Sequence, residues 1–156
     1  MGIGVDMHPL VTGRPLWLGG VKIPFEKGLE GHSDGDCLTH AIVDAVLGAA
    51  GMGDIGTHFG ASRPQYKNAK SEVFLKGAMK KIHAKGWRVG NVDATVMCEA
   101  PRLGVHFPKM KKHLVRLLGV APTAVNLKAT TAKGLGPIGE GDAISVFVVL
   151  TLVGAE

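Results

Sequence analysis

Residues 35–50 read GDCLTHAIVDAVLGAA and contain a clear helical pattern. Apolar side chains recur at Leu38, Ile42, Val46 and Ala49, which is the three- to four-residue spacing of one face of an α-helix. We therefore expect a helix over 35–50 that buries this face against the rest of the protein.

Strands and further helices are predicted on both sides of this helix. Alternating or continuous apolar residues predict the strands, and glycine or proline at segment ends predicts where helices begin and stop. The expected strands cover 2–6, a hairpin over 15–24 that turns at Gly19-Gly20, 92–98, 125–131 and 143–153; the further helices cover 71–85 and 108–118, with a loop over 26–33 and irregular chain over 51–64. This alternation predicts an α+β fold (an α/β sandwich), in which helices cover one face of a four- to five-stranded mixed sheet.

Length and composition narrow the possible functions. A chain of 156 residues is long enough for one domain with a full core, so we expect a single domain over 1–156. The formal net charge of +5 suits an anionic partner, either nucleic acid or a phosphorylated small molecule. Because arginines interleaved with aromatic residues are lacking, a nucleic-acid partner is not expected.

The cysteines and the hydropathy of the chain indicate in which cellular compartment the protein is expected. Cys37 and Cys98 lie far apart in apolar surroundings, which predicts buried free thiols in a reducing compartment. No apolar run reaches membrane-spanning length and no signal segment is recognisable, so no membrane partner is expected. The expected location is cytoplasmic if the protein is bacterial, and a plastid-type organelle if a targeting peptide was removed.

Two short segments contain side chains that commonly bind zinc. Asp6 and His8 are two residues apart in a predicted strand, so both point to the same side. His40 needs only to face them from the helix over 35–50. One carboxylate and two imidazoles leave the fourth zinc position open for water or substrate, as in a catalytic site.

The residues before His40 are expected to support it. Asp36 lies one helical turn earlier and could accept the second ring N–H of His40, while Ser33 and Asp34 either help in this or cap the helix. A lone histidine is more often a hydrogen-bonded core residue than a metal ligand. Here Asp6 and His8 favour the metal site.

A second candidate site follows the strand predicted at 125–131. Ala129-Thr130-Thr131 leads into KGLGPIG at 133–139, whose backbone N–H groups and hydroxyls could hold phosphate. A plain glycine-rich turn explains this run equally well. The loop over 100–103, Ala100-Pro101-Arg102-Leu103, adds one cation.

Together these motifs resemble the 2-C-methyl-D-erythritol 2,4-cyclodiphosphate synthase family of the non-mevalonate isoprenoid pathway. The resemblance covers nearly the whole chain in order, and HSDGD at 32–36 followed by His40 is highly specific. The other matching segments are GVDMH at 4–8, GGVKIP at 19–24, DAVLGAA at 44–50, GDIG at 53–56, GNVD at 90–93, APR at 100–102 and NLKATT at 126–131.

The resemblance implies a homotrimer with active sites at subunit boundaries. It also implies a lyase reaction in which 4-diphosphocytidyl-2-C-methyl-D-erythritol 2-phosphate becomes a cyclic diphosphate and CMP is released. The 2-phosphate of the substrate is the nucleophile, so alignment and charge neutralisation are needed rather than an activated serine or cysteine. Zinc would polarise the β-phosphate, and magnesium or manganese would accompany the substrate diphosphate.

The resemblance assigns roles by motif match. It implies that Asp6, His8 and His40 bind zinc and that these residues and Thr131 are catalytic. It implies that the substrate is bound by His32 and Ser33 on a mobile loop, by Asp54, Ile55 and Gly56 at the ribose or erythritol end, and by Ala100, Pro101, Arg102, Leu103, Thr130 and Thr131 around the cytidine and its phosphates, partly from a neighbouring subunit.

Three places depart from the family pattern. Lys133 stands where the family usually has a magnesium-binding glutamate, and Glu140 where it often has an arginine near the diphosphate. We expect both to border the substrate, and we hypothesise that Lys133 supplies the positive charge lost at position 140. The acidic loop usual after Phe59 is replaced by GASRP at 60–64, beside the expected methylerythritol pocket.

Two other functions compete with this synthase. A non-catalytic relative would bind cytidine nucleotides or isoprenoid diphosphates, and the reversed charges at Lys133 and Glu140 favour it. An unrelated zinc hydrolase would need a general base near the metal, for which Asp36 is the obvious candidate. CMP should bind to the synthase and to the non-catalytic relative, but not to the hydrolase.

Overall fold

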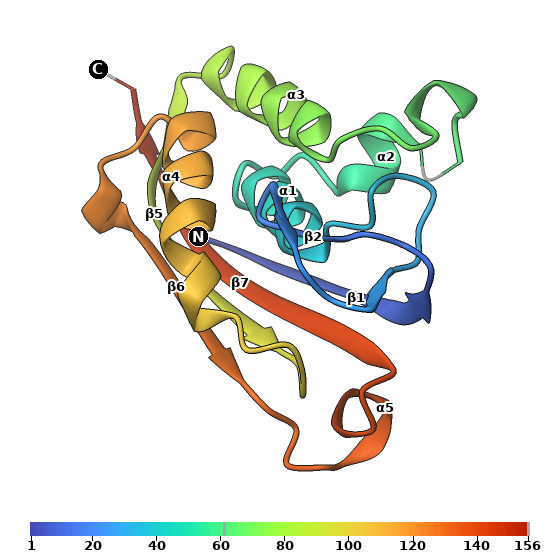
Figure 1. Ribbon diagram of the computed structural model, residues 1–156. Coiled ribbons are helices and arrows are strands. Elements are labelled where there is room, and N and C mark those ends of the chain that lie inside the picture. The colour runs from blue at the N-terminus through green and yellow to red at the C-terminus, as the bar shows by residue number, and fades with distance from the viewer. Residues whose placement is uncertain (61, 156) are drawn as a thin grey trace.

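A five-stranded sheet forms one layer of the protein in the computed structural model, which describes residues 1–60 and 62–155 (Figure 1). The sheet order is β4-β1-β7-β5-β6, and β2 and β3 form a separate hairpin. The strands are β1 (Gly2–Thr12), β2 (Leu16–Leu18), β3 (Val21–Ile23), β4 (Lys27–Leu29), β5 (Trp87–Met97), β6 (Val125–Thr130) and β7 (Ala143–Gly154). The helices are α1 (Cys37–Ala49), α2 (Ile55–Phe59), α3 (Glu72–His83), α4 (Phe107–Leu118) and α5 (Gly136–Gly139), with 3-10 turns at Pro64–Tyr66, Gly104–His106 and Pro122–Ala124.

Strand pairing confirms the predicted mixed sheet. The central strand β7 pairs antiparallel with β1 on one side and with β5 on the other. The β1–β4 pair is also antiparallel, whereas β5 and β6 run parallel. The β-branched and apolar residues of β7 suit a strand that has neighbours along both edges.

Helices α1, α3 and α4 lie on one side of this sheet, as predicted (Figure 1). Ile144 and Leu150 of β7 are fully buried in the core that these helices share with the sheet. Helix α1 approaches β1 most closely because Gly2 and Gly4 have no side chains. A Cβ atom on Gly4 would collide with the carbonyl oxygen of Ala41 in α1. Backbone therefore lies directly against backbone where α1 crosses β1.

The opposite side of the sheet carries exposed apolar side chains. They come from alternate positions of β1 and β7, as expected for strands whose other side is buried. These residues, which we call the open sheet face, are Ile3 (65% exposed), Val5 (50%), Met7 (60%), Phe147 (45%) and Val149 (42%).

The hairpin forms where it was predicted and is attached to α1. Gly19 and Gly20 at its turn have φ angles of 58° and 74°, in the left-handed region that glycine adopts without strain. The buried Asp36 carboxylate accepts both of their N–H groups, at 2.9 and 2.7 Å. The same carboxylate caps α1 by accepting the N–H of Thr39 at 3.0 Å.

Several predicted boundaries were wrong. Strand β1 continues to Thr12, and β5 begins at Trp87 rather than 92. The predicted loop over 26–33 contains β4, and the predicted irregular chain over 51–64 contains α2. Strand β4 has three residues and α2 has five, so neither is long enough to show a periodic pattern.

Cys37 and Cys98 are buried free thiols, as predicted. Among the helices in the described residues, none is both long enough and apolar enough to cross a membrane.

Candidate metal centre

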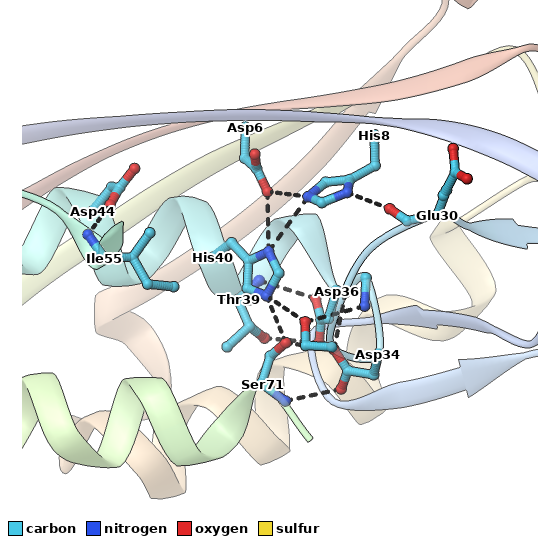
Figure 2. Close-up of polar contacts among 12 residues, drawn as sticks. Asp6, His8, Glu30, Asp34, Asp36, Thr39, His40, Asp44, Ile55 and Ser71 are labelled. Atoms are coloured by element: carbon cyan, nitrogen blue, oxygen red, sulfur yellow. Dashed lines mark hydrogen bonds and ion pairs between the residues drawn. The ribbon is translucent and has the colours of Figure 1, made fainter. Parts of the chain in front are cut away.

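Asp6, His8 and His40 form a compact group between β1 and α1 (Figure 2). The Oδ2 atom of Asp6 lies 2.8 Å from Nε2 of His8 and 3.2 Å from Nδ1 of His40, and these two nitrogens are 3.4 Å apart. One potential ligand atom from each residue lies within 4.8 Å of the others. The structure thus brings together the three residues expected to bind zinc.

The close contact between β1 and α1 positions this group. Asp6 and His8 alternate along β1 and share one side of the strand. His40 precedes Ala41, whose carbonyl oxygen lies against Gly4. Since helix and strand meet through their backbones, no intervening side chain has to be packed to bring His40 to the strand.

The Asp6 carboxylate is ionised at neutral pH. Burial raises its pKa, but hydrogen bonds and positive charge from His40 and His8 outweigh burial and hold the pKa of Asp6 well below its usual range. Burial lowers the pKa of His8, but the hydrogen bond and charge of Asp6 reverse this and raise it overall. An anionic oxygen beside two imidazoles attracts a cation.

The outer ring nitrogens of both histidines also have partners. The Nδ1 atom of His8 lies 2.5 Å from the carbonyl oxygen of Glu30, which can only accept, so Nδ1 carries the proton of the neutral ring. The Nε2 atom of His40 lies 2.7 Å from Oγ of Ser71. Each ring can therefore present an unprotonated nitrogen to its neighbours in the group. One carboxylate oxygen and two such nitrogens form a donor set that could bind a divalent metal ion.

The proposed supporting role of Asp36 was wrong. Its carboxylate faces Gly19, Gly20 and Thr39 and is fully used in joining the hairpin to α1. A carboxylate bonded in this way is also unsuited to be the base of a hydrolase. Ser71, rather than Asp36, is the hydrogen-bond partner of Nε2 of His40. Oγ of Ser33 lies 3.2 Å from the same nitrogen.

A cavity of about 230 Å³ opens beside the metal group. Three aromatic rings form one wall, with centroid distances of 5.3 Å between Phe59 and Phe74 and 5.0 Å between Tyr66 and Phe74. The lining residues are Asp6, His8, His32, Ser33, His40, Ile55, Gly56, Phe59, Gly60, Tyr66 and Phe74. The predicted residues His32, Ser33, Ile55 and Gly56 therefore share a cavity with the three candidate ligands.

Asp54 plays a local structural role next to this cavity. It accepts the N–H of Thr57 at 2.7 Å and so caps α2, which carries Ile55 and Gly56. The N–H of Ile55 donates to Asp44 of α1 at 2.8 Å (Figure 2). Burial raises the pKa of Asp44. These contacts fix the start of α2 against α1.

A second cavity of about 420 Å³ lies where the chain leaves β5 and β6. Burial raises the pKa of the Cys98 thiol to about 11, so this lining group is neutral. The cavity is lined by Cys98, Glu99, Pro101, Arg102, Leu103, Gly104, Val105, Ala129, Thr130 and Thr131. All predicted cytidine-binding residues except Ala100 are among them, and Ala100 precedes Pro101 in the same loop.

Lys133 and Glu140 are both exposed on the connection between β6 and β7. Neither is among the described residues that line the two cavities. The substituted loop over 60–64 includes Gly60, which lines the first cavity, whereas Ala61 lies outside the described residues.

Sequence reasoning missed the aromatic wall and the role of Ser71. Tyr66 and Phe74 carry no motif, although their closeness to the loop over 60–64 was a weak signal. Ser71 was interpreted only as the start of a helix, because its partner His40 lies 31 residues away.

The fold and the ligand group define an α+β protein with a candidate metal centre at the end of a small-molecule cavity. The model of the YgbB family matches residues 1–153. A 2-C-methyl-D-erythritol 2,4-cyclodiphosphate synthase from Bordetella avium (strain 197N) is 51% identical over 152 residues, covering 97% of this chain and 94% of that protein. The chain therefore belongs to the YgbB family.

Solved structures agree with this assignment. The bifunctional IspDF of Campylobacter jejuni matches with a TM-score of 0.95 at 38% identity, over 99% of this chain and 42% of that one. A 2C-methyl-D-erythritol-2,4-cyclodiphosphate synthase in a CDP-bound form matches with a TM-score of 0.90 at 36% identity, over 97% of this chain and 99% of that one.

Proposed function

We infer that the chain catalyses the reaction for which its relatives are named. It converts 4-diphosphocytidyl-2-C-methyl-D-erythritol 2-phosphate to 2-C-methyl-D-erythritol 2,4-cyclodiphosphate and releases CMP. The observation that carries this inference is the Asp6, His8 and His40 group at the end of a cavity, in a chain 51% identical to a synthase over 97% of its length.

The reaction requires alignment more than an activated side chain. An oxygen of the 2-phosphate forms a bond to the β-phosphorus, and the bond from that phosphorus to the bridging oxygen breaks. CMP leaves with this oxygen and its electron pair. We assign Asp6, His8 and His40 to hold zinc, which when bound supplies a Lewis acid for the phosphate oxygen. A magnesium or manganese ion would accompany the substrate diphosphate.

The two cavities suit the two ends of this substrate. His32, Ser33, Ile55 and Gly56 would hold the methylerythritol phosphate beside the metal group. Asp54, which caps α2, would contact the ribose or erythritol end. Thr131 would orient the diphosphate as a catalytic residue, and the cytidine would lie in the second cavity among Ala100, Pro101, Arg102, Leu103 and Thr130. A CDP-bound relative supports the nucleotide part of this assignment.

We propose that the protein is a homotrimer whose substrate spans two subunits. The open sheet face supports assembly, because contiguous exposed apolar surface commonly marks an interface. The two cavities of one chain have no lining residue in common among those described. A neighbouring subunit would bring the second cavity of one chain to the metal group of another.

The proposal is tested by phosphorus NMR of the purified protein with the cytidine-linked substrate, zinc and magnesium. We expect a cyclic diphosphate together with an equal amount of CMP. CMP without the cyclic product would indicate a hydrolase instead.

A non-catalytic binding protein is the second candidate, because Lys133 and Glu140 reverse two charges of the family pattern. CMP binding by a zinc-loaded protein, without turnover in the same NMR experiment, would establish this alternative.

A further inference from the structure

Ser71 directly precedes α3 at the N-cap position, but its side chain does not cap the helix as a serine at this position usually does. Within the described residues its hydroxyl makes no capping hydrogen bond to the first turn of α3. The side chain is 1% exposed, and its Oγ lies 2.7 Å from Nε2 of His40 and hydrogen-bonds Oδ1 of Asp34 (Figure 2). A buried hydroxyl therefore connects a candidate metal ligand to a carboxylate.

The direction of these hydrogen bonds follows from the metal group. Nδ1 of His40 faces Asp6 and His8, so it is the nitrogen that must be free of a proton to bind a metal. The proton of the neutral ring then lies on Nε2, and Oγ of Ser71 accepts it. The hydroxyl of Ser71 has one proton of its own, which it donates to the Asp34 carboxylate.

Asp34 is held in place by the backbone around it. Its carboxylate also accepts the N–H of Ser71 at 2.9 Å and the N–H of Asp36 at 3.0 Å. Its own N–H donates to the carbonyl oxygen of Ala69 at 3.0 Å. The carboxylate cannot turn away from Ser71 without losing the hydrogen bonds that it accepts from these two backbone N–H groups.

We propose that Ser71 and Asp34 are positioning residues that orient His40 for metal binding. This proposal rests on the metal role of His40 given above. A hydroxyl and a carboxylate behind the ring fix its tautomer and orientation and raise the basicity of Nδ1. Partners of this kind typically change metal affinity by about 10- to 100-fold.

The test is zinc affinity of the full-length protein without substrate, measured by competition with a coloured chelator. We expect Ser71→Ala to bind zinc ~10- to 100-fold more weakly than the unmodified protein. Ser71→Thr, which keeps the hydroxyl, should recover most of the affinity. The visible spectrum of the cobalt-loaded protein should also change in Ser71→Ala, because the His40 ring is released.

Thr39→Val is the matched control. It removes another buried hydroxyl that bonds a carboxylate, at 2.8 Å from Asp36, one residue before His40. Both variants should lose stability, but only Ser71→Ala should lose zinc affinity and change the cobalt spectrum. Equal zinc affinities for Ser71→Ala and Thr39→Val would show that Ser71 serves only to join two segments, and would overturn the proposal.

Ser33 is the other hydroxyl near Nε2, at 3.2 Å. Ser33→Ala should weaken zinc binding less than Ser71→Ala, and the reverse order would also overturn the assignment. If Ser71→Ala does not fold, Asp34→Asn provides the same comparison. Unchanged zinc affinity in Asp34→Asn would then overturn the proposal. Failure of the metal assignment itself is distinguishable, because the unmodified protein and His40→Ala would then bind zinc equally.

Discussion

His40 illustrates how a single residue acquires a role from contacts that are far apart in sequence. Asp6 and His8 lie 34 and 32 residues before it, and Ser71 lies 31 residues after it. The alternation of Asp6 and His8 could be predicted, because it depends only on strand geometry. The contact with Ser71 could not, because a serine before a helix looks the same whether it caps that helix or bonds another segment.

Removal of His40 tests the metal group directly. We expect His40→Ala to lose bound zinc and to reduce kcat/KM by at least ~100-fold, because positioned charge at the reacting phosphate is lost. Elemental analysis and a CMP-release assay measure the two effects. His83→Ala, which changes an exposed histidine of α3, should alter neither. Full activity of His40→Ala without zinc would contradict the assignment.

Lys133 tests the departure from the family pattern. If its ammonium group stands in for the charge reversed at Glu140, Lys133→Ala should lower kcat/KM by about 10- to 100-fold, the value of a charge-assisted hydrogen bond. The magnesium concentration for half-maximal rate should shift as well. Lys109→Ala on the exposed side of α4 is the control. Turnover and magnesium dependence that do not change in Lys133→Ala would reject the hypothesis, and the double change Lys133→Glu with Glu140→Arg should remain active.

Among the structural elements, length decided what could be predicted from sequence. Helix α1 has 13 residues and β7 has 12, so their apolar patterns repeat often enough to be recognised. Strand β4 and helix α2 are too short for that, and they form because neighbouring elements support them. Pairing with β1 holds β4, and the Asp44 carboxylate holds the start of α2.

The contact between α1 and β1 can be tested through Gly4. Gly4→Ala places a methyl group against the Ala41 carbonyl and should destabilise the fold by about 1–3 kcal/mol, as overpacked cores do. Thermal unfolding measures this, and zinc affinity should fall with it. Gly154→Ala, where a Cβ meets open space, should leave the melting temperature nearly unchanged. Equal melting temperatures for the two variants would show that α1 can shift away from β1 without a loss of stability.

Helices α3 and α4 are linked by Glu72, whose carboxylate lies 2.8 Å from Lys76 and 3.4 Å from His113. The hydrogen bond from Lys76, with the nearby positive charges, lowers the pKa of Glu72 in the folded state. Its stabilising effect is therefore present above the unfolded pKa of about 4.3 and lost as pH falls through the lower folded value.

Because Glu72 is partly exposed, the effect should be about 0.5 kcal/mol. Melting temperatures of the unmodified protein and Glu72→Gln should differ most at neutral pH and converge in strong acid. The exposed Glu26→Gln is the control. A difference that persists unchanged into acid would exclude a role for the charge.

At the level of the whole molecule, the open sheet face is the main feature that one chain leaves unexplained. The sheet buries one side against helices and leaves apolar side chains exposed on the other, a pattern that commonly marks an interface. Strands were predicted over 2–6 and 143–153 from their apolar residues, but the sequence alone does not say which side of them the helices cover.

Val149 lies on this face opposite Ile3, so a change there tests the proposed trimer. A buried, unpaired carboxylate costs on the order of several kcal/mol, so Val149→Asp should dissociate the assembly and abolish turnover. Sedimentation velocity measures the subunit number. Val73→Asp, at a similarly exposed valine of α3, should leave the assembly intact. A Val149→Asp protein that still sediments as a trimer would place the interface elsewhere.

Gly2 and Gly4 have a consequence for how this protein can evolve. Where a helix packs through large side chains, each replacement in the core shifts the helix slightly. Here the distance between α1 and β1 is determined by main-chain atoms, which substitution elsewhere does not alter. The surrounding core can therefore diverge over long lineages while Asp6, His8 and His40 keep the same spacing.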